Sequence, residues 1–511
     1  MLGSRSFLAG GLLTLVLGAS SASFAQKLDI KVLGSYGGEV YRAGSAEIVA
    51  YDHKGQRLYV VNGADNAIDV LDLKDPTTFK KLMSLSMAPY GKGANSVAVH
   101  GDVVAAAVEA DPKQAPGKLV VMDRDGGNVR TVTVGALPDM VTITPNGKYA
   151  LVANEGEPSD DYKVDPEGTV SIVRLSDLRV RTITFGHLKR SDFGRGAHFP
   201  SPKGTTLAQD IEPEYIAVSQ DSRTAFVTLQ ENNAVAVIDI ERALLTRVFA
   251  LGFKDFSRFD FDVSDTDKKI NMRKWPVKGL YQPDSIATFV DRKVTYLVTA
   301  NEGDARDYKG YSEEARVAEL KLDETVFPNA SELQKNDQLG RLKVTKAQGD
   351  TGGNGIFKEL VTFGGRSFSI WTADGKLVWD SGNEFSRILA ERHPTWANSQ
   401  GQESTFDSRS DDKGEEPEGL AIGMLRGKRH AFIGLERMGG VMIYDLSNPR
   451  APTFVEYVHN SNPKGEVKAK TAGDVAPEGV IFIEASKSPT GHALLVTASE
   501  VSGTTTVYEI K

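Results

Sequence analysis

The stretch PEYIAVSQDSRTAFVTLQE, residues 213–231, decides the fold class. A short run rich in β-branched and aromatic residues ends in the polar turn QDSR, and a second such run ends in a glutamate. A third run, AVAVIDI at residues 234–240, follows almost at once. Runs of this composition, separated by turn residues, predict short antiparallel strands joined by hairpins.

The same plan occurs seven times along the chain. The units begin at residues 46, 94, 138, 213, 283, 417 and 477. Seven units of about four short strands, with no helical period between them, predict an all-β fold, a seven-bladed β-propeller. The alternatives are a β-solenoid or two β-sandwiches. The last unit ends after its third strand, so we expect residues 27–36 to pair with TTTVYEI near the C-terminus and to close the ring.

The first 25 residues have the features of a signal peptide. Arg5 supplies a positive charge, FLAGGLLTLVLGA is apolar, and Ser23 and Ala25 fit a cleavage site for small residues. The alternative is an uncleaved anchor. We expect a mature chain of residues 26–511 that forms one propeller domain, with a periplasmic or secreted location. No later segment is apolar for long enough to span a membrane.

Composition excludes several kinds of chemistry. The 511 residues include no cysteine, so disulfides, catalytic thiols and thiolate metal sites are excluded. The net charge of -8 argues against a nucleic-acid partner. The sequence also has no GxSxG, P-loop or HExxH motif, and its eight histidines show no ligand spacing.

Three insertions interrupt the repeat, at about residues 252–282, 309–364 and 383–416. Loops that follow second strands, or that join blades, emerge on one face of a propeller, so we expect all three insertions at one end. Loops on a rigid scaffold often carry binding or catalysis. The alternative is that they only shield the mouth of a channel.

Carboxylates recur at fixed places in the repeat. The residues that open the first strands are Glu47, Asn95, Asp139, Glu214, Asp284, Glu418 and Glu478. The residues that close the second strands are Glu109, Glu155, Glu231, Glu302, Glu436 and Glu500; Gly63 and Ala64 break this set in the first unit. In a propeller both sets lie at the end that carries the insertions.

So many carboxylates around one mouth repel one another, because two charges 4 Å apart cost about 4 kcal/mol at an effective dielectric constant near 20. Raised pKa values, paired Arg and Lys, or bound cations relieve this repulsion. Oxygen ligands suit Ca²⁺, or else Mg²⁺ or another divalent cation. The predicted metal ligands are Asp139, Glu155, Glu214, Asp284, Glu302, Asp407, Glu418, Glu436 and Glu478. For any single glutamate, hydrogen bonding to loop amides is the alternative role.

Three charged segments accompany these sets. Residues 262–272 and 349–360 resemble calcium loops, but the second has Gly352 and Val361 at ligand places, and we interpret both as solvated turns. The segment FDSRSDDKGEEPEG, residues 406–419, places acidic and basic residues next to the start of the unit that begins at residue 417. Such a mixture suits a metal together with an anionic group such as phosphate.

Several long motifs resemble the choice-of-anchor I family. They include ALPDMVTITPNGKYALVANEGEPSDDY, YLVTANEGDARDY, FDSRSDDKGEEPEG and LLVTASEVSGTTTVYEI, and the resemblance spans almost the whole mature chain. The family includes secreted bacterial proteins, some labelled alkaline phosphatase, and is related to mesenchyme-specific cell-surface glycoproteins. The resemblance implies a propeller-like, extracytoplasmic protein, and it transfers no catalytic residue. Relatives tend to have a fuller acidic loop where this chain has GDTGGNG.

Two functions remain. The first is a calcium-dependent phosphomonoesterase at the propeller mouth, in which Asp304, Arg306, Arg409 and Arg437 act on a phosphorylated small molecule. The second is a non-enzymatic binding or adhesion propeller that recognises a cell-surface ligand. Since propellers perform both roles, the fold does not choose between them, and the oligomeric state stays open.

Overall fold

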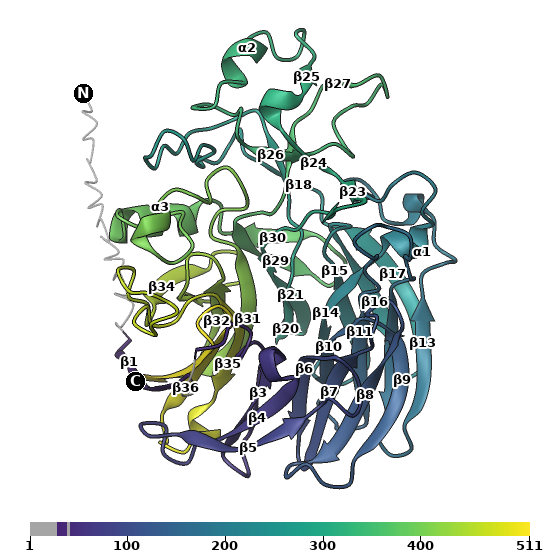
Figure 1. Ribbon diagram of the computed structural model, residues 1–511, viewed down its shortest axis with the longest axis vertical. Coiled ribbons are helices and arrows are strands. Elements are labelled where there is room, and N and C mark those ends of the chain that lie inside the picture. The colour runs from purple at the N-terminus through teal and green to yellow at the C-terminus, as the bar shows by residue number, and fades with distance from the viewer. Residues whose placement is uncertain (1–27, 38–40) are drawn as a thin grey trace, which may run out of the picture.

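The computed structural model describes residues 28–37 and 41–511, and these residues form an all-β fold (Figure 1). The expected signal peptide, residues 1–25, lies outside the described residues. None of the helices in the described part of the chain has the length and hydrophobicity needed to cross a membrane.

Most strands of the described chain belong to seven four-stranded antiparallel sheets. The first four sheets are β2 (Val49–Asp52), β3 (Arg57–Asn62), β4 (Ala67–Asp72) and β5 (Lys80–Ser86); β6 (Gly93–His100), β7 (Val103–Glu109), β8 (Pro116–Asp123) and β9 (Arg130–Ala136); β10 (Pro138–Ile143), β11 (Tyr149–Asn154), β12 (Thr169–Arg174) and β13 (Arg179–Thr184); β14 (Pro213–Val218), β15 (Thr224–Leu229), β16 (Ala234–Asp239) and β17 (Leu244–Ala250).

The other three sheets follow the same order of strands with longer connections. They are β20 (Ile286–Asp291), β21 (Val294–Asn301), β29 (Ser367–Thr372) and β30 (Leu377–Asp380); β31 (Pro417–Leu425), β32 (Lys428–Leu435), β33 (Val441–Asp445) and β34 (Thr453–Val458); β35 (Pro477–Ile483), β36 (Ala493–Ser499), β37 (Thr504–Ile510) and β1 (Ile30–Tyr36).

Polar turns set the register of these hairpins. Between β14 and β15, the carboxylate of Asp221 accepts hydrogen bonds from the hydroxyl of Ser219 at 2.6 Å and from the amide of Arg223 at 3.1 Å. The turn is thereby closed, and Val218 lies opposite Ala225 in the ladder. An aspartate that bonds to a nearby backbone amide stabilises a turn in this way.

The N-terminal strand β1 completes the last sheet, as the sequence predicts. It pairs antiparallel with β37, with Ile30 opposite Ile510 and Tyr36 opposite Thr505. Lys27, the first residue of the predicted strand, lies outside the described residues. The two ends of the described chain therefore lie side by side (Figure 1).

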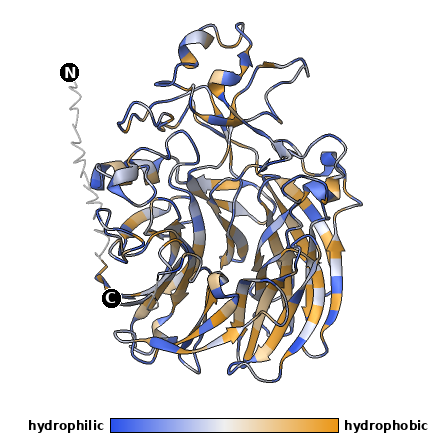
Figure 2. Cartoon of the chain, viewed as in Figure 1, coloured by the Kyte–Doolittle hydropathy of each residue, from blue (hydrophilic) through white to orange (hydrophobic). Residues whose placement is uncertain are grey.

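Apolar side chains fill the space between each sheet and the next. The hydrophobic residues concentrate along the strands, as Figure 2 shows. Seven clusters each join two sheets that follow one another, and one of them packs Leu494 and Val496 of the last sheet against Leu58 and Val60 of the first. The strands β2, β6, β10, β14, β20, β31 and β35 contact one another in this order, and β35 also contacts β2. The described sheets thus pack in a closed cycle.

The first two insertions form a separate small unit above the sheets (Figure 1). Its elements are β18 (Phe253–Asp255), β19 (Lys278–Leu280), β22 (Asp307–Tyr308), β23 (Tyr311–Ser312), β24 (Glu314–Arg316), β25 (Lys321–Leu322), α2 (Ala330–Leu333), β26 (Lys343–Thr345), β27 (Ile356–Phe357) and β28 (Val361–Thr362). Strands β19 and β28 pair in parallel and join the two insertions. Phe256, Trp275, Leu339 and Val344 belong to the core of this unit.

The third insertion lies at the same end of the molecule as the first two. It carries α3 (Glu384–Arg392), the longest α-helix of the described residues; the short α1 (Leu207–Asp210) precedes the fourth sheet. The backbone amide of Lys343, in the second insertion, donates a hydrogen bond of 2.9 Å to the carbonyl of Asp411 in the third. The expected gathering of the insertions at one end is therefore present (Figure 1).

Candidate functional site

A cavity of about 170 Å³ lies where the first strands of the sheets meet. Residues that open these strands form part of its wall, as the repeat predicts. They are Asn95, Asp139, Glu214, Asp284, Glu418 and Glu478. The structure therefore brings five of the nine predicted metal ligands around one cavity.

Glu47 is the strand-opening carboxylate that does not belong to this wall. It lies in the first unit, where Gly63 replaces the glutamate that closes the second strand elsewhere. A Cβ atom on Gly63 would lie 2.7 Å from Oε1 of Glu47. The carboxylate of Glu47 thus fills the space that the missing side chain leaves.

Burial and mutual repulsion raise the pKa of these carboxyl groups. Burial, followed by the charges of nearby carboxylates, raises the pKa of Asp139 to about 6. The same two causes raise the pKa of Glu214 and Glu478 well above the ordinary range. A cation or another positive charge nearby would favour the ionised form of these groups.

Further carboxylates, including those that close the second strands, lie at the same end of the sheets. The ladder pairs Pro138 with Asn154 and Pro417 with Leu435, so the start of each first strand adjoins the end of the second strand. Within the described residues, carboxylate oxygens gather within 4.8 Å of one another in three groups. These groups are Glu155, Glu212 and Glu231; Asp284, Glu302 and Glu418; and Glu302, Glu416 and Glu436.

The group of Glu302, Glu416 and Glu436 is surrounded by basic side chains. Nζ of Lys413 lies 2.9 Å from Glu302 and 3.2 Å from Glu416. Arg437 lies 3.2 Å from Glu416 and 2.6 Å from Glu436, and Arg409 also pairs with Glu416. Burial opposes the ionisation of Glu416, but these three cations hold its pKa below the ordinary value. Three cations therefore face three carboxylates here.

Glu302 connects this group to the central cavity. It also belongs to the group with Asp284 and Glu418, which line the cavity. Its Oε2 accepts a hydrogen bond of 2.9 Å from the side-chain amide of Gln230. Burial raises the pKa of Glu302, and Lys413 opposes this increase.

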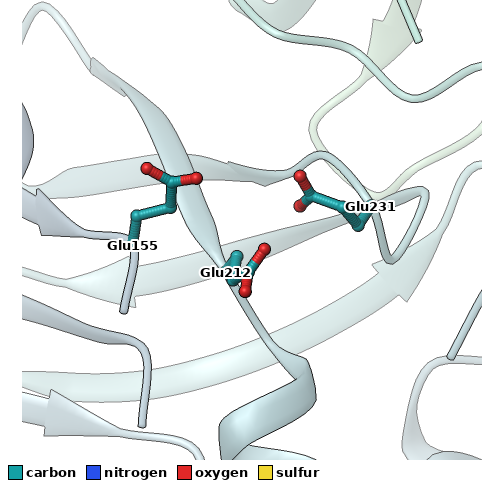
Figure 3. A group of neighbouring side chains, drawn as sticks. All are labelled: Glu155, Glu212 and Glu231. Atoms are coloured by element: carbon teal, nitrogen blue, oxygen red, sulfur yellow. The ribbon is translucent and has the colours of Figure 1, made fainter. Parts of the chain in front are cut away.

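The group of Glu155, Glu212 and Glu231 comes from three segments that follow β11, α1 and β15. The side chain of Glu212 lies between the other two (Figure 3). Arg306 binds Glu212, with Nη1 at 2.6 Å from Oε1. The second oxygen of Glu212 and Oε2 of Glu231 have no hydrogen-bond partner among the described residues.

A pocket of about 360 Å³ opens between the sheets and the inserted unit. Asp304, Arg409 and Arg437, three of the four predicted catalytic residues, line it together with Lys413 and Lys343. Asp304 lies 3.6 Å from Nζ of Lys413. Nε of Arg409 has no hydrogen-bond partner within the described chain, so this guanidinium keeps one unused donor.

Arg306, the fourth predicted catalytic residue, lies elsewhere. Its side chain is 1% exposed, and Nη2 donates a hydrogen bond of 2.9 Å to the carbonyl of Asp210. It is not part of the pocket wall, and its side-chain partners are Glu212, Asp210 and Tyr162. Arg306 therefore supports Glu212 in this structure, and its contact with a phosphate stays a prediction.

Asp407 is also separated from the other predicted metal ligands. It is 1% exposed and accepts a hydrogen bond of 2.6 Å from the hydroxyl of Ser410. Its acidic neighbours are Asp262 and Asp267 of the first insertion, which after burial raise its pKa to about 7. It belongs to none of the three carboxylate groups, because the third insertion packs it against the inserted unit.

The two loops that resemble calcium sites differ in environment. Asp350 is half-buried and accepts hydrogen bonds from the amides of its own turn, for example Gly355 at 2.7 Å. Asp262 is 2% exposed and accepts a hydrogen bond of 2.8 Å from the amide of Asn271. The interpretation as a solvated turn therefore suits the exposed residues 351–355. In the other loop it fails at the buried residues 262–264, whereas Thr266, Lys268 and Lys269 are exposed.

Sequence reasoning missed Glu212 and Glu416 as members of the carboxylate groups. Each of them stands directly before the proline that opens a first strand, in IEPEY and EEPEG. The repeated Glu-Pro-Glu pattern was the available signal. Two glutamates on either side of one proline at the mouth provide one carboxylate for the cavity and one for the outer group.

Comparison with known proteins identifies a family. The model of the choice-of-anchor I domain matches residues 47–449. The chain is 26% identical over 312 residues to a mesenchyme-specific cell surface glycoprotein of Strongylocentrotus purpuratus, which covers 54% of this chain and 38% of that protein. It is 28% identical over 191 residues to Gigasin-3a of Magallana gigas, which covers 35% of this chain and 67% of that protein. The chain thus spans well under half of the first relative.

Solved structures show lower similarity. Hydrazine synthase of Kuenenia stuttgartiensis aligns over 92% of this chain and 97% of its own, with a TM-score of 0.47 and 14% identity. The Cps50 (Swd1) β-propeller domain of Myceliophteria thermophila aligns over 94% of this chain and 100% of its own, with a TM-score of 0.46 and 10% identity.

Proposed function

The chain belongs to the choice-of-anchor I family, and on this basis we propose that it is an exported β-propeller that binds an anionic ligand at its acidic mouth. The seven four-stranded sheets are its seven blades, and β1 closes the last one. A location in the periplasm or outside the cell agrees with the signal-like residues 1–25 and with a relative named as a cell surface glycoprotein.

The pocket of Asp304, Arg409 and Arg437 is the ligand site. The observation that carries this proposal is the gathering of Arg409, Arg437 and two lysines on the wall of one pocket. Guanidinium groups next to other cations suit a phosphate or carboxylate group, because both accept parallel N–H bonds. The side chain of Arg437 is 32% exposed, so a ligand from solvent reaches it without unfolding of the mouth.

Divalent-cation-dependent hydrolysis of phosphomonoesters is the second candidate. The acidic groups that border the pocket favour it, because Ca²⁺ or Mg²⁺ held by carboxylates both neutralises phosphate and activates water. Within this function Asp304 and the carboxylates hold the cation, and Arg409 and Arg437 neutralise charge on the phosphate oxygens. The non-enzymatic alternative uses the same pocket to bind a cell-surface ligand.

Calorimetric titration with phenyl phosphate in 1 mM Ca²⁺ tests the binding proposal. We expect saturable binding that is at least about tenfold weaker in Arg437→Gln, which removes one charged contact from the pocket. Arg392→Gln is the matched control, since Arg392 also pairs with a glutamate, Glu456, but lies outside the pocket wall. If Arg437→Gln binds phenyl phosphate as tightly as Arg392→Gln and the parent chain do, the pocket is not the ligand site.

An assay with an aryl phosphate, with and without chelator, separates the two candidates. Hydrolysis that the chelator abolishes supports the enzyme, and binding without hydrolysis with Ca²⁺, Mg²⁺ or Mn²⁺ supports the binding propeller. Absence of both binding and hydrolysis overturns the proposed function.

A further inference from the structure

The two outer carboxylate groups differ in the positive charge that surrounds them. Three basic side chains, Lys413, Arg409 and Arg437, pair with the group of Glu302, Glu416 and Glu436. The group of Glu155, Glu212 and Glu231 has one direct ion pair, between Arg306 and Glu212. The difference leaves the second group with excess negative charge.

No other basic side chain of the described chain forms an ion pair with this second group. Lys113 reduces the repulsion at Glu155, but its ammonium group pairs with Glu157. Arg306 also interacts with the carboxylate and the carbonyl of Asp210. The positive charge of Arg306 is therefore shared between two carboxylates, and none of its bonds reaches Glu231.

The oxygens of the second group have unused hydrogen-bonding capacity. Glu212 is 1% exposed and Glu231 is 4% exposed. Oε2 of each has no hydrogen-bond partner within the described residues. A buried carboxylate oxygen without a partner loses its solvation and gains nothing in exchange, which costs about 1–3 kcal/mol or more. Two such oxygens at one place indicate that a bound species supplies the missing interaction.

We propose that Glu155, Glu212 and Glu231 bind one Ca²⁺ ion, and that Arg306 is the positioning residue that holds Glu212 in place. The ligand oxygens lie within 4.8 Å of one another, close enough for one ion to bind all three. Ca²⁺ accepts irregular sets of carboxylate oxygens, whereas Mg²⁺ demands near-octahedral geometry. Water molecules complete the coordination. This proposal does not depend on the ligand pocket or on hydrolysis.

The proposed site lies where three parts of the chain meet. Glu155 follows β11 of the third sheet, Glu212 precedes β14 of the fourth sheet, and Glu231 follows β15 of the same sheet. Tyr308 of the inserted unit lies near the group, because its hydroxyl donates a hydrogen bond of 3.2 Å to Glu157, two residues after Glu155. A cation here binds two adjacent sheets and the base of the inserted unit together.

Metal titration of the full chain tests the site. After treatment with chelator and dialysis, the protein is titrated with Ca²⁺ by calorimetry, and Tb³⁺ emission is excited through tyrosine, since Tyr308 adjoins the group. We expect a Ca²⁺ site whose affinity falls at least tenfold in Glu231→Gln, together with loss of the Ca²⁺-induced rise in melting temperature.

Two further variants locate the effect. Glu155→Gln removes a second ligand and should weaken Ca²⁺ binding to a similar extent. The test therefore still works if one of the two ligand variants fails to fold. Glu109→Gln is the matched control, because Glu109 closes a second strand in the same way but belongs to none of the three groups. The proposal is overturned if the parent chain binds no Ca²⁺ at millimolar concentration. It is also overturned if both ligand variants bind Ca²⁺ as the control does.

Discussion

Glu47 illustrates how a single missing side chain changes the chemistry of its neighbour. Because Gly63 leaves space next to it, the Glu47 carboxylate lies apart from the cavity wall and close to Glu500. Burial, then the charges of Glu500 and Asp139, raises the pKa of Glu47 to about 8 from an ordinary value of 4.5. The folded protein thus keeps a proton on Glu47 at a pH where the unfolded chain has lost it.

This difference predicts a fall in stability with rising pH. Between about pH 4.5 and pH 8 the folded state binds one proton more than the unfolded state at Glu47, so the free energy of unfolding decreases as pH rises. The stabilisation that Glu47 contributes to the folded state is complete below pH 4.5 and lost above about pH 8. Urea unfolding of the metal-free chain at several pH values measures it. In Glu47→Gln the decrease should be smaller, and an identical pH profile for both chains contradicts the prediction.

Arginines that look alike in the sequence have different roles in the structure. Arg306 and Arg437 both follow a glutamate that closes a second strand, yet the side chain of Arg306 is 1% exposed and that of Arg437 is 32% exposed. The cause is the contact of Arg306 with Glu212, which lies 94 positions earlier in the chain. Local sequence carries no information on such a contact, so the ring of carboxylates was predictable while the partners of Arg306 were not.

Strands are the elements that local sequence predicts best. The seven repeated openings correspond to seven four-stranded sheets, because hairpin turns and alternating apolar residues act over a few positions. The internal structure of the insertions was not predicted, since their short strands pair across long separations, as Lys278 with Val361 does. No repeat exists there to guide the assignment.

At this scale β1 provides a direct test of closure. Deletion of residues 26–36 exposes the edge of β37 and removes Leu33 and Tyr36 from a cluster between the last and first sheets. We expect the melting temperature to fall by about 5 °C or more. Calorimetry measures it, with the exposed Lys31→Ala as a control that should melt like the parent chain. Unchanged melting after the deletion contradicts a closing role for β1.

For the whole molecule, the main division is between the cycle of sheets and the inserted unit. The core around Phe256, Trp275, Leu339 and Val344 consists of residues from the first two insertions. The seven clusters between sheets contain other residues. Two sets of apolar contacts that share no members favour two steps of unfolding.

Leu339→Ala tests this division. Leu339 is fully buried, and its truncation should destabilise the inserted unit by about 2–5 kcal/mol. We expect differential scanning calorimetry to show a lower first transition and an unchanged second one. Leu151→Ala, in the core between the third and fourth sheets, should instead shift the second transition. If Leu339→Ala shifts every transition equally, the molecule unfolds as one unit.

The pairing of β1 with β37 also determines an order in time. The ribosome makes β1 first of the described strands and β37 last of them, so the N-terminal strand waits for its partner until all the strands between them have been made. Contacts between such distant residues form slowly, and an unpaired strand edge is prone to aggregate during the wait. For the exported protein that we propose, the same delay is useful. A cycle of sheets that cannot close before β37 is made leaves the preceding chain unfolded for longer, and an unfolded chain is easier to export.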